Sequence, residues 1–575
     1  MNVSGREHQA PAPAGLAART SAGPLALRAG LVVLTAAVLF FCYWRQSQIA
    51  PVSSDGSANI LQAWDMLHGN VLLHDWHVSD VSFYTTELPQ YALIEALFGL
   101  GPWVVHVAAA MTYTLLVLLA AFLAKGDARG AAGTARALLA AGLMLAPQLS
   151  ATQIVLLSPN HTGTAVPLLV TWLLIDRASP ARGVRGARGG RGGGQPPREQ
   201  GGSGGDRPPG PARYVPVLVC LLFTWTMVAD FVVLLTGIVP LVLVAVARAC
   251  PGLLRRGKRP GSRGYELALA GAAAVAGLAG LVAPKVMAAV GGYHQAHVGT
   301  AVDLAQLQHG AWVTLQAFLE LFGANLAGAS FYGASPVLEV VFVALHLAGA
   351  ALVAWALGLA FLRFFRSAEL IVPAFAVAIV LNLGAYMIST HAQDLLGARE
   401  MAAVLPLGAV LAGRVFGDRI PAWIGAAKRW FVPLLAVLTA GYLASLGYGA
   451  AQAPAPVINE PLATWLAAHR LTDGLAGYWQ ANSTTVDSGR RLLLSAVVQN
   501  PGDRLVPYEW ETDDANYDPA RHFANFVVAD GPFPLRGMQI SAELTFGRPQ
   551  QIYRADGYTI MVWNTNLLAR LPGRA

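Results

Sequence analysis

The chain has 575 residues, of which 55% are hydrophobic and only 12% are charged, and its formal net charge is +7. Soluble domains carry about 25% charged residues, so this composition excludes an ordinary soluble protein. The basic residues lie in short segments between apolar runs, as membrane topology signals do, which argues against nucleic-acid binding.

The N-terminal segment, residues 1–26, is rich in Ala, Pro and Gly, and we expect a disordered cytoplasmic tail there. The apolar run 27–44 lacks a small-residue cleavage site before the polar loop that follows. It is therefore expected to be an uncleaved signal anchor and the first span of a transmembrane domain that extends to residue 450.

Eleven apolar segments in this domain are candidate spans, because a membrane-crossing helix needs about 20 mostly apolar residues. The stretch 214–248 is too long for one helix, and two short spans that meet at Asp230 on the outer side account for it. The candidates are 27–44, 102–124, 136–150, 162–176, 214–229, 231–248, 265–290, 335–360, 369–388, 399–416 and 431–450.

The distribution of Lys and Arg predicts the orientation. The segment 177–213 alone holds eight of them, and it is a Gly/Arg-rich segment too poor in apolar residues to fold, so we expect a disordered cytoplasmic loop. With the N-terminus inside, only Arg45, Lys285 and Arg399 fall outside before residue 451. Residues 451–575 are then expected on the extracytoplasmic side.

The first outer loop, residues 45–100, carries six acidic residues and no basic residue after Arg45. Ile60, Leu61, Trp64 and Leu67 share one face of an expected amphipathic helix that ends at Gly69-Asn70. A second helix is expected to begin near Pro89 and to run to Gly99. Both helices should lie along the membrane surface.

Acidic and histidine side chains in this loop are candidates for catalysis or for metal binding, namely Asp55, His74, Asp75, His77, Asp80 and Glu87. Carboxylates at a lipid–water boundary can act as a general base or hold a divalent metal ion. For Asp55 the competing explanation is a helix N-cap, which Asp fills well and which spacing alone favours. His294 and His297 have i,i+3 spacing, but they are better explained as surface histidines.

A second polar cluster precedes the span 399–416 and contains His391, Asp394, Arg399 and Glu400. An arginine at the outer end of a span is costly unless it is paired or bound to an anion. It could snorkel to the interface or hold a phosphate group bidentately, and the pattern alone does not separate these alternatives.

The C-terminal part, residues 451–575, has the composition of an ordinary globular domain. We expect helices at 458–470 and 536–546 and strands at 491–498, 524–529, 549–554 and 558–563, that is, a small α/β domain. Tyr478, Trp479 and Trp510 could contact a sugar or a wall polymer, but a place in the domain core is the favoured explanation.

The order of these motifs resembles the start of GT-C glycosyltransferases of the protein-O-mannosyltransferase and aminoarabinose-transferase type. One span is followed by SSDGSANILQAWDMLHGNVLL and then by TTELPQYALIEALFGLGPWVVHV, and AREMAAVLPLGAVLAG is similar to a later family segment. The resemblance covers the architecture of residues 27–450, with local sequence match over about 80 residues. It implies a mainly α polytopic membrane bundle of about 11 spans, GT-C-like, with a small extracytoplasmic C-terminal α/β domain.

This resemblance also implies an activity and a site. The family transfers a sugar, with inversion, from a polyprenyl-phosphate donor to an acceptor on the outer face. Asp55 matches the catalytic acidic position and Arg399 a position that contacts the donor phosphate. Asp80, Glu87, His391 and Asp394 are the further candidates for substrate binding, and a divalent metal ion held by His77 and Asp80 is left open.

The expected partners are a polyprenyl-phosphate sugar, membrane lipid and an unidentified glycan, lipid or protein acceptor in a bacterial plasma membrane, with no role for nucleic acid. Two alternatives stay open: a catalytically silent envelope scaffold of the same fold, and a transporter or flippase. Few charges inside the spans and no internal repeat argue against a transporter.

Overall fold

The computed structural model describes residues 22–178, 213–250, 263–298, 304–326, 335–364, 369–532 and 535–573. The predicted cytoplasmic tail lies outside the described residues up to residue 21. Its last five residues, 22–26, belong instead to the first helix, because they continue the apolar run. The predicted Gly/Arg-rich loop 177–213 also lies outside the described residues, apart from its ends.

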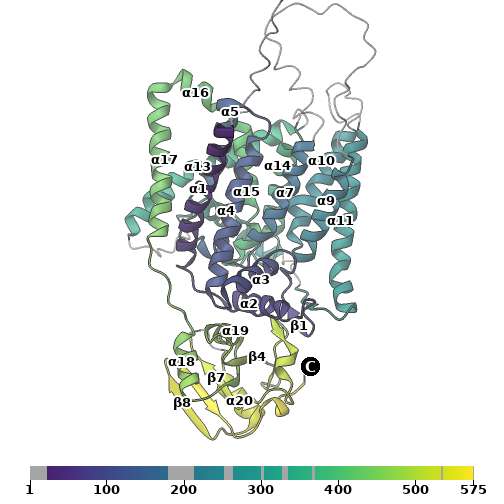
Figure 1. The fold of residues 1–575 in the computed structure, drawn as a ribbon, viewed down its shortest axis with the longest axis vertical. Helices are drawn as coiled ribbons and strands as arrows, with labels where there is room; N and C mark the ends of the chain where they lie inside the picture. The colour runs from purple at the N-terminus through teal and green to yellow at the C-terminus, as the bar shows by residue number, and fades with distance from the viewer. Residues whose placement is uncertain are drawn as a thin grey trace, which may run out of the picture.

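Figure 1 shows a bundle of long helices, with a small mixed domain at one end and α16 at the opposite end. Lipid cannot hydrogen-bond to the backbone, and an apolar segment in a membrane therefore folds as a helix, which satisfies its own backbone groups. The bundle helices are α1 (Ala22–Ser47), α4 (Trp103–Lys125), α5 (Gly130–Met144), α6 (Thr152–Val155), α7 (Thr162–Ala178), α9 (Val215–Ala229), the π-helical turn η1 (Leu234–Ile238), α10 (Val239–Ala249), α11 (Arg263–Ala289), η2 (Leu304–Gln306), α12 (Leu307–Leu321), α13 (Pro336–Leu362), α14 (Ile371–Met387), the 3₁₀ helix η4 (Leu396–Met401), α15 (Val404–Phe416), α16 (Ile420–Ala426) and α17 (Lys428–Ala450).

Five described helices are long and apolar enough to cross a membrane, and the shorter apolar ones include α9, α14 and α15. Every predicted span overlaps a described helix, although the total of eleven spans stays a prediction. The span predicted at 399–416 is shorter as an α-helix, because residues 396–401 form the 3₁₀ helix η4. Asp230 ends α9 and separates it from the next helix, as the hairpin interpretation predicted.

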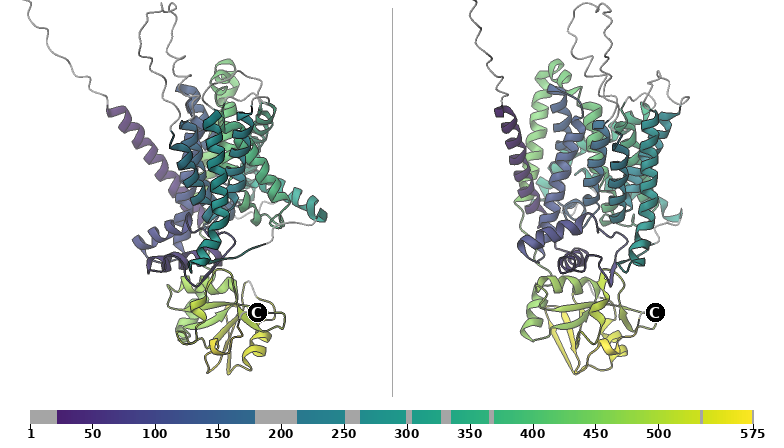
Figure 2. Two further views of the ribbon diagram at one scale, coloured as in Figure 1. Left: turned by 90° about the vertical axis from the view of Figure 1, so that its right-hand side faces the viewer. Right: turned by 45° about the vertical axis from the view of Figure 1, so that its right-hand side comes forward.

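Two helices lie across the end of the bundle, α2 (Ser54–Leu67) and α3 (Glu87–Phe98), as Figure 2 shows. Both were predicted, but the polar face of α2 is not solvated. Asn59 and Gln62 are at most 1% exposed, because the C-terminal domain covers them. The helix is therefore enclosed between the bundle and that domain rather than lying on an open membrane surface.

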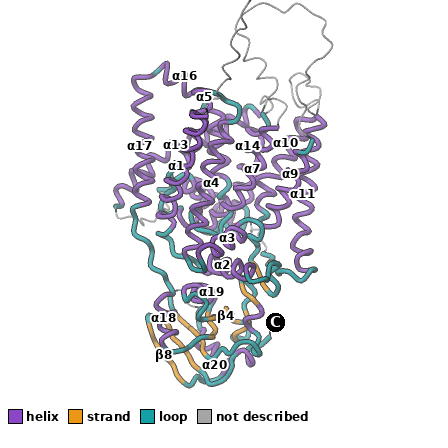
Figure 3. Tube along the Cα trace, in the orientation of Figure 1, coloured by secondary structure: helices purple, strands orange, loops and turns teal. Residues whose placement is uncertain are grey.

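The C-terminal domain contains a six-stranded mixed sheet in the order β5-β4-β3-β7-β9-β8. β3 pairs parallel with both β4 and β7, whereas β5, β8 and β9 pair antiparallel with their neighbours. The strands are β3 (Asp473–Ala476), β4 (Leu493–Gln499), β5 (Leu505–Pro507), β7 (Phe526–Asp530), β8 (Gln551–Ala555) and β9 (Tyr558–Val562), and the helices are α18 (Glu460–Ala468), α19 (Tyr478–Asp487), η5 (Asp514–Tyr517), α20 (Met538–Phe546) and η6 (Leu568–Arg570). Figure 3 shows that strands gather in this domain and at its junction with the bundle.

A second, three-stranded sheet ties the domain to the bundle. Its strands are β2 (His294–Gln295), β1 (Trp76–Val78) and β6 (Thr512–Asp513), which come from the loop after α11, the first outer loop and the C-terminal domain. β1 pairs antiparallel with β6, and the Asp514 amide donates to the Asp75 carbonyl at 2.8 Å. Main-chain hydrogen bonds therefore fix the domain against the first outer loop.

Candidate active site

Asp55 lies in the first turn of α2, at the junction of bundle and C-terminal domain. The helix is capped by Ser53, whose side chain accepts from the Gly56 amide at 3.3 Å. The N-cap explanation for Asp55 is therefore wrong, because Ser53, two residues earlier, already fills that role. The carboxylate is left available for other contacts.

Arg399 comes from η4, 344 residues further along the chain, and reaches the same place: its Nη1 lies 3.7 Å from Oδ2 of Asp55. Both side chains are partly exposed, Asp55 to 27% and Arg399 to 39%. They line one cavity of about 630 Å³, a volume that includes its open mouth. The two residues that the sequence assigned to base and phosphate binding thus face each other.

The cavity contains two more of the predicted site residues, Asp80 and His391, and also Glu400. His391 Nδ1 lies 4.0 Å from Oε1 of Glu400. Asp80 belongs to the loop after β1, and burial, followed by the charge of Glu400, raises the pKa of its carboxyl group. Polar residues of the first outer loop and of η4 therefore line the same cavity.

A buried histidine, His161, stands behind Glu400 and was not among the predicted residues. Its Nδ1 lies 2.7 Å from Asp230 and its Nε2 lies 2.9 Å from Glu400, and the side chain is 3% exposed. Burial alone would lower the pKa of His161, but the two carboxylates raise it well above its ordinary value. Thr164 also donates to Asp230, at 2.7 Å. A protonated His161 thus joins the α9–α10 hairpin to the cavity wall.

The C-terminal domain forms the opposite wall with Trp510 and Glu511, and its Tyr478 hydroxyl donates to Oδ1 of Asp55. Glu511 is 2% exposed, accepts from the Ser79 amide at 3.1 Å and accepts from Gln62 Nε2. Trp510 is partly buried at the cavity and Tyr478 is partly buried against Asp55, whereas Trp479 is 46% exposed. Of the three aromatic residues only Tyr478 packs against the domain core, so the favoured core explanation is wrong for Trp479 and Trp510.

The carboxyl groups of the cavity differ in their charge at neutral pH. Burial raises the pKa of Glu511 to about 8, so this group is mostly neutral at pH 7. Burial alone would also raise the pKa of Glu400, but His161, His391 and Arg399 together lower it to about 2. The positively charged groups Arg399 and protonated His161 both lie on the bundle side of the cavity.

Two residues that were predicted to bind substrate, Glu87 and Asp394, lie away from this cavity. Glu87 is buried at the start of α3 and accepts from the Thr86 hydroxyl, and burial raises its pKa to about 8. Asp394 accepts from the amides of Leu396 and Gly397 and so shapes the turn before η4. Each therefore has a local structural role and does not line the cavity.

His77, the other predicted metal ligand, pairs with Asp514 at 3.1 Å and stacks on His294. Asp80, by contrast, lines the cavity. Within the described ranges, no group of three His, Cys, Asp or Glu side chains is arranged to hold a metal ion. The two predicted ligands thus have separate roles.

Sequence reasoning missed His161 and Glu511, and it named Tyr478 only as a core residue or a possible sugar contact, without a link to Asp55. A weak signal for His161 exists, since Asn160 and His161 directly precede the span 162–176 on its outer side. The residues Tyr478 and Glu511 carry no local signal, because only the docking of the C-terminal domain brings them to Asp55.

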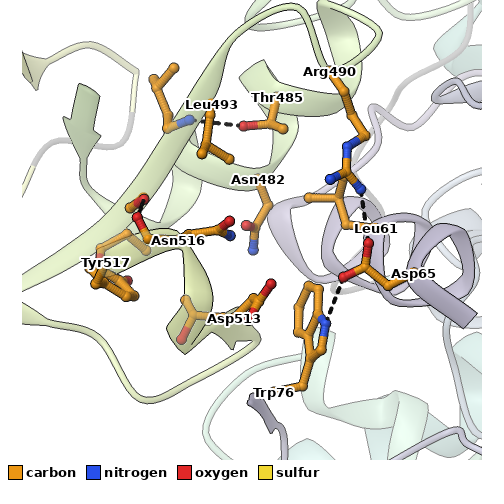
Figure 4. A pocket seen from close by; sticks show the side chains of 14 residues that line it. Leu61, Asp65, Trp76, Asn482, Thr485, Arg490, Leu493, Asp513, Asn516 and Tyr517 are labelled. Carbon is orange, nitrogen blue, oxygen red and sulfur yellow. Dashed lines mark hydrogen bonds and ion pairs between the residues drawn. The ribbon is translucent and has the colours of Figure 1, made fainter. Parts of the chain in front are cut away.

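A second cavity, of about 430 Å³, lies beside the first between α2, β1 and the C-terminal domain (Figure 4). Asp65 accepts there from Trp76 Nε1 and from Arg490 Nη1, each at 3.0 Å. These side chains satisfy one another across the junction. This cavity therefore belongs to the contact that holds the domain in place.

Comparison with known proteins places the fold. No family model and no curated protein sequence matches the chain. Among solved structures it is similar to ArnT from Cupriavidus metallidurans bound to undecaprenyl phosphate, with 15% identity and a TM-score of 0.52 over 92% of this chain and 98% of that one. The apo form of the same protein matches with 15% identity and a TM-score of 0.51 over 95% and 100% of the two chains. The predicted GT-C fold is confirmed, since the similarity spans the bundle and the C-terminal domain together.

Proposed function

From a fold shared with a protein crystallised with undecaprenyl phosphate, we propose that this chain is a membrane glycosyltransferase. It moves a sugar from a polyprenyl-phosphate donor to a hydroxyl-bearing acceptor on the extracytoplasmic face. The observation that carries the proposal is the meeting of Asp55 with Arg399 in one cavity, 3.7 Å apart. The two groups have the chemistries that the reaction needs, and they lie where a lipid-borne headgroup can arrive.

The reaction is a single displacement at the anomeric carbon. Asp55 takes the proton of the acceptor hydroxyl, whose oxygen forms the new glycosidic bond while the bond from the anomeric carbon to the phosphate oxygen breaks. The leaving polyprenyl phosphate takes the electron pair, and Arg399 stabilises the charge that develops on it. A guanidinium has five donors, so it can hold the phosphate while it stays near Asp55.

The charge state of the cavity supports this assignment. An anionic phosphate would be repelled if every carboxyl group were ionised, but the pKa of Glu511 is raised to about 8 and that of Asp80 is also raised. His161 stays protonated and shares its single positive charge between Glu400 and Asp230. The guanidinium of Arg399 is 39% exposed, so it is the cationic group of the cavity that a phosphate can reach.

The test compares Asp55→Asn with wild type in a deletion strain, with mass spectrometry of polyprenyl-phosphate sugars and envelope glycans as the readout. We expect the deletion to accumulate the donor lipid and Asp55→Asn to accumulate it equally, because loss of a general base lowers the rate about 10²- to 10⁴-fold. Full transfer by a correctly inserted Asp55→Asn protein would refute the assignment, and an unchanged lipid and glycan profile in the deletion would favour a scaffold.

Binding of the leaving group tests the role of Arg399 separately. Purified Arg399→Gln protein should lose affinity for undecaprenyl phosphate in native mass spectrometry, because a charge-assisted bidentate contact is removed. Arg554→Gln, on an exposed strand of the C-terminal domain, is the matched control that should bind as wild type does. Equal binding by both variants would exclude Arg399 from the phosphate site.

A further inference from the structure

We propose that Tyr478 is a positioning residue for the carboxylate of Asp55, so that the C-terminal domain completes the active site. The inference rests on the proposed function and extends it to a residue that the bundle itself does not contain. Its observation is a hydrogen bond between residues 423 positions apart: the Tyr478 hydroxyl donates to Oδ1 of Asp55.

A second contact holds the same pair of segments together in the opposite direction. The hydroxyl of Ser54 donates to the main-chain carbonyl of Tyr478 at 2.5 Å. Ser54 and Asp55, consecutive residues of α2, thus bond the main chain and the side chain of Tyr478 in α19. Such a double contact fixes both the place of Tyr478 and the direction in which its phenol points.

The phenol and the guanidinium divide the two oxygens of Asp55 between them. Tyr478 occupies Oδ1, whereas Arg399 Nη1 lies 3.7 Å from Oδ2. A carboxylate that is free to rotate about its side chain would interchange these oxygens. With Oδ1 held, Oδ2 keeps free lone pairs on the side of the cavity where a phosphate and an acceptor hydroxyl would meet.

Tyr478 is itself held by the core of its domain rather than by a mobile loop. It is the first residue of α19, and its ring packs edge-on against Trp479 and Tyr508 with centroid distances of 5.3 and 5.4 Å. Asn482, one turn further along α19, donates to the carbonyl of Glu511 at 2.9 Å. A group held by a packed element positions its partner better than one on a loop.

The charged and titratable groups that face Asp55 set the expected pH behaviour. The C-terminal domain contributes Tyr478, Tyr508 and Glu511, and the bundle side of the same cavity contributes Asp80, His391, Arg399 and Glu400. Burial and the neighbouring carboxylate raise the pKa of the Tyr478 phenol well above its ordinary value, so it stays a donor at neutral pH. Removal of this donor favours protonation of the carboxylate, and activity should then fall at a higher pH on acidification.

The experiment uses the full chain in detergent, with the polyprenyl-phosphate sugar fraction extracted from the deletion strain as donor and the envelope fraction of the same strain as acceptor. Wild type, Tyr478→Phe, Asp55→Asn and Tyr558→Phe are compared for initial rates of polyprenyl phosphate release between pH 5 and 9. Tyr558→Phe is the matched control, because it removes a tyrosine hydroxyl that bonds Asn459 at 2.7 Å within the same domain.

We expect Tyr478→Phe to lower kcat about 10- to 100-fold, as loss of a hydrogen bond to a charged group does, with KM for the donor changed less than about twofold. Its acid limb should move to higher pH, while Tyr558→Phe keeps the wild-type profile. Wild-type kcat and an unmoved acid limb in Tyr478→Phe, with Asp55→Asn inactive, would overturn the inference and leave the proposed function standing. Full activity of Asp55→Asn would instead refute the proposed function.

A protein with 3,5-difluorotyrosine at position 478 provides a second test of the role of Tyr478 if Tyr478→Phe does not fold. Fluorination leaves the ring and its contacts in place and makes the phenol a stronger donor. The acid limb should then move to lower pH, opposite to the direction expected for Tyr478→Phe. An unmoved limb in the fluorinated protein would show that the hydroxyl does not act on Asp55.

Discussion

Glu511 is a buried acid whose environment, rather than its type, decides its charge. Burial raises its pKa to about 8, against an ordinary value of 4.5. A folded-state pKa above the unfolded one means that the folded protein favours the protonated form. The associated stability is full below the ordinary pKa and is lost as the pH rises towards 8.

Glu511→Gln should therefore remove part of the pH dependence of stability. Glutamine is close in shape to the protonated acid, and its oxygen can still accept from the Ser79 amide. In thermal unfolding in detergent, the melting temperature of Glu511→Gln minus that of wild type should increase steadily from pH 5 to pH 8. Glu543→Gln, at an exposed position of α20, is the control that should follow wild type, and parallel curves for Glu511→Gln would contradict the assignment.

His161 and Asp230 form a buried charged pair, in which Asp230 has no exposed side-chain surface. Removal of one partner leaves an uncompensated buried charge, which costs about 3–5 kcal/mol. His161→Asn should lower the free energy of unfolding by an amount of this order. The double variant with Asp230→Asn should recover part of the loss, because the orphaned carboxylate is gone. Unfolding in mixed micelles measures the cycle, and strictly additive losses would show that the two groups do not interact.

Among the elements, those with a local sequence signal could be predicted and those made by long-range contacts could not. The apolar length of α11 and α13 is a property of their own sequences, and both were predicted. The helix α19 reads YWQANSTTVD, without an apolar stripe, and it becomes a helix where it packs on α2. Three-residue β1 becomes a strand only where distant segments pair with it, β2 from the loop after α11 and β6 from the C-terminal domain.

The candidate site follows the same division. Asp55 and Arg399 could be paired because each lies in a motif that resembles a known family, on the same predicted side of the membrane. The resemblance extends over the bundle only, so neither the contact of Tyr478 with Asp55 nor the place of Glu511 at the cavity could be predicted. Their place depends on the packing of one domain on another, which no single segment encodes.

The close packing of α15 against α5 depends on Gly413 and Gly417, one turn apart. A Cβ at Gly413 would lie 2.8 Å from the carbonyl oxygen of Arg136, and one at Gly417 would lie 2.7 Å from the Arg136 Cα. Small residues at this spacing allow two helix backbones to approach closely in a membrane.

Gly413→Ala should lower the free energy of unfolding by about 1–3 kcal/mol, because the backbone it meets cannot move aside as a side chain would. Gly142→Ala is the control within α5, since a Cβ there meets nothing within 4 Å and alanine favours a helix. Unfolding of the two variants in the same mixed micelles checks the expectation, and equal stability would refute a tight α5–α15 contact.

At the scale of the whole molecule, polar chemistry divides between two ends of the bundle. The cavity with Asp55 and Arg399 lies at the end that carries the C-terminal domain. At the other end, Arg414 is 3% exposed and pairs with Asp176 at 2.7 Å and with Glu369 at 3.1 Å. These charges sit near the ends of α7 and α15 and satisfy one another, so they do not form the chain of ionisable groups that a transport path requires.

Because the two ends of the bundle differ, the predicted orientation of the chain in the membrane can be measured directly. The distribution of Lys and Arg places α16 and the start of α17 in the cytoplasm and the C-terminal domain outside. Arg554 on β8 and Lys428 at the start of α17 are both exposed and lie at opposite ends of the molecule (Figure 1). In a background where Cys42, Cys220 and Cys250 are serine, a membrane-impermeant maleimide should label Arg554→Cys in intact spheroplasts. It should label Lys428→Cys only after lysis, whereas the reverse pattern would place the cavity, and the reaction proposed for it, on the cytoplasmic side.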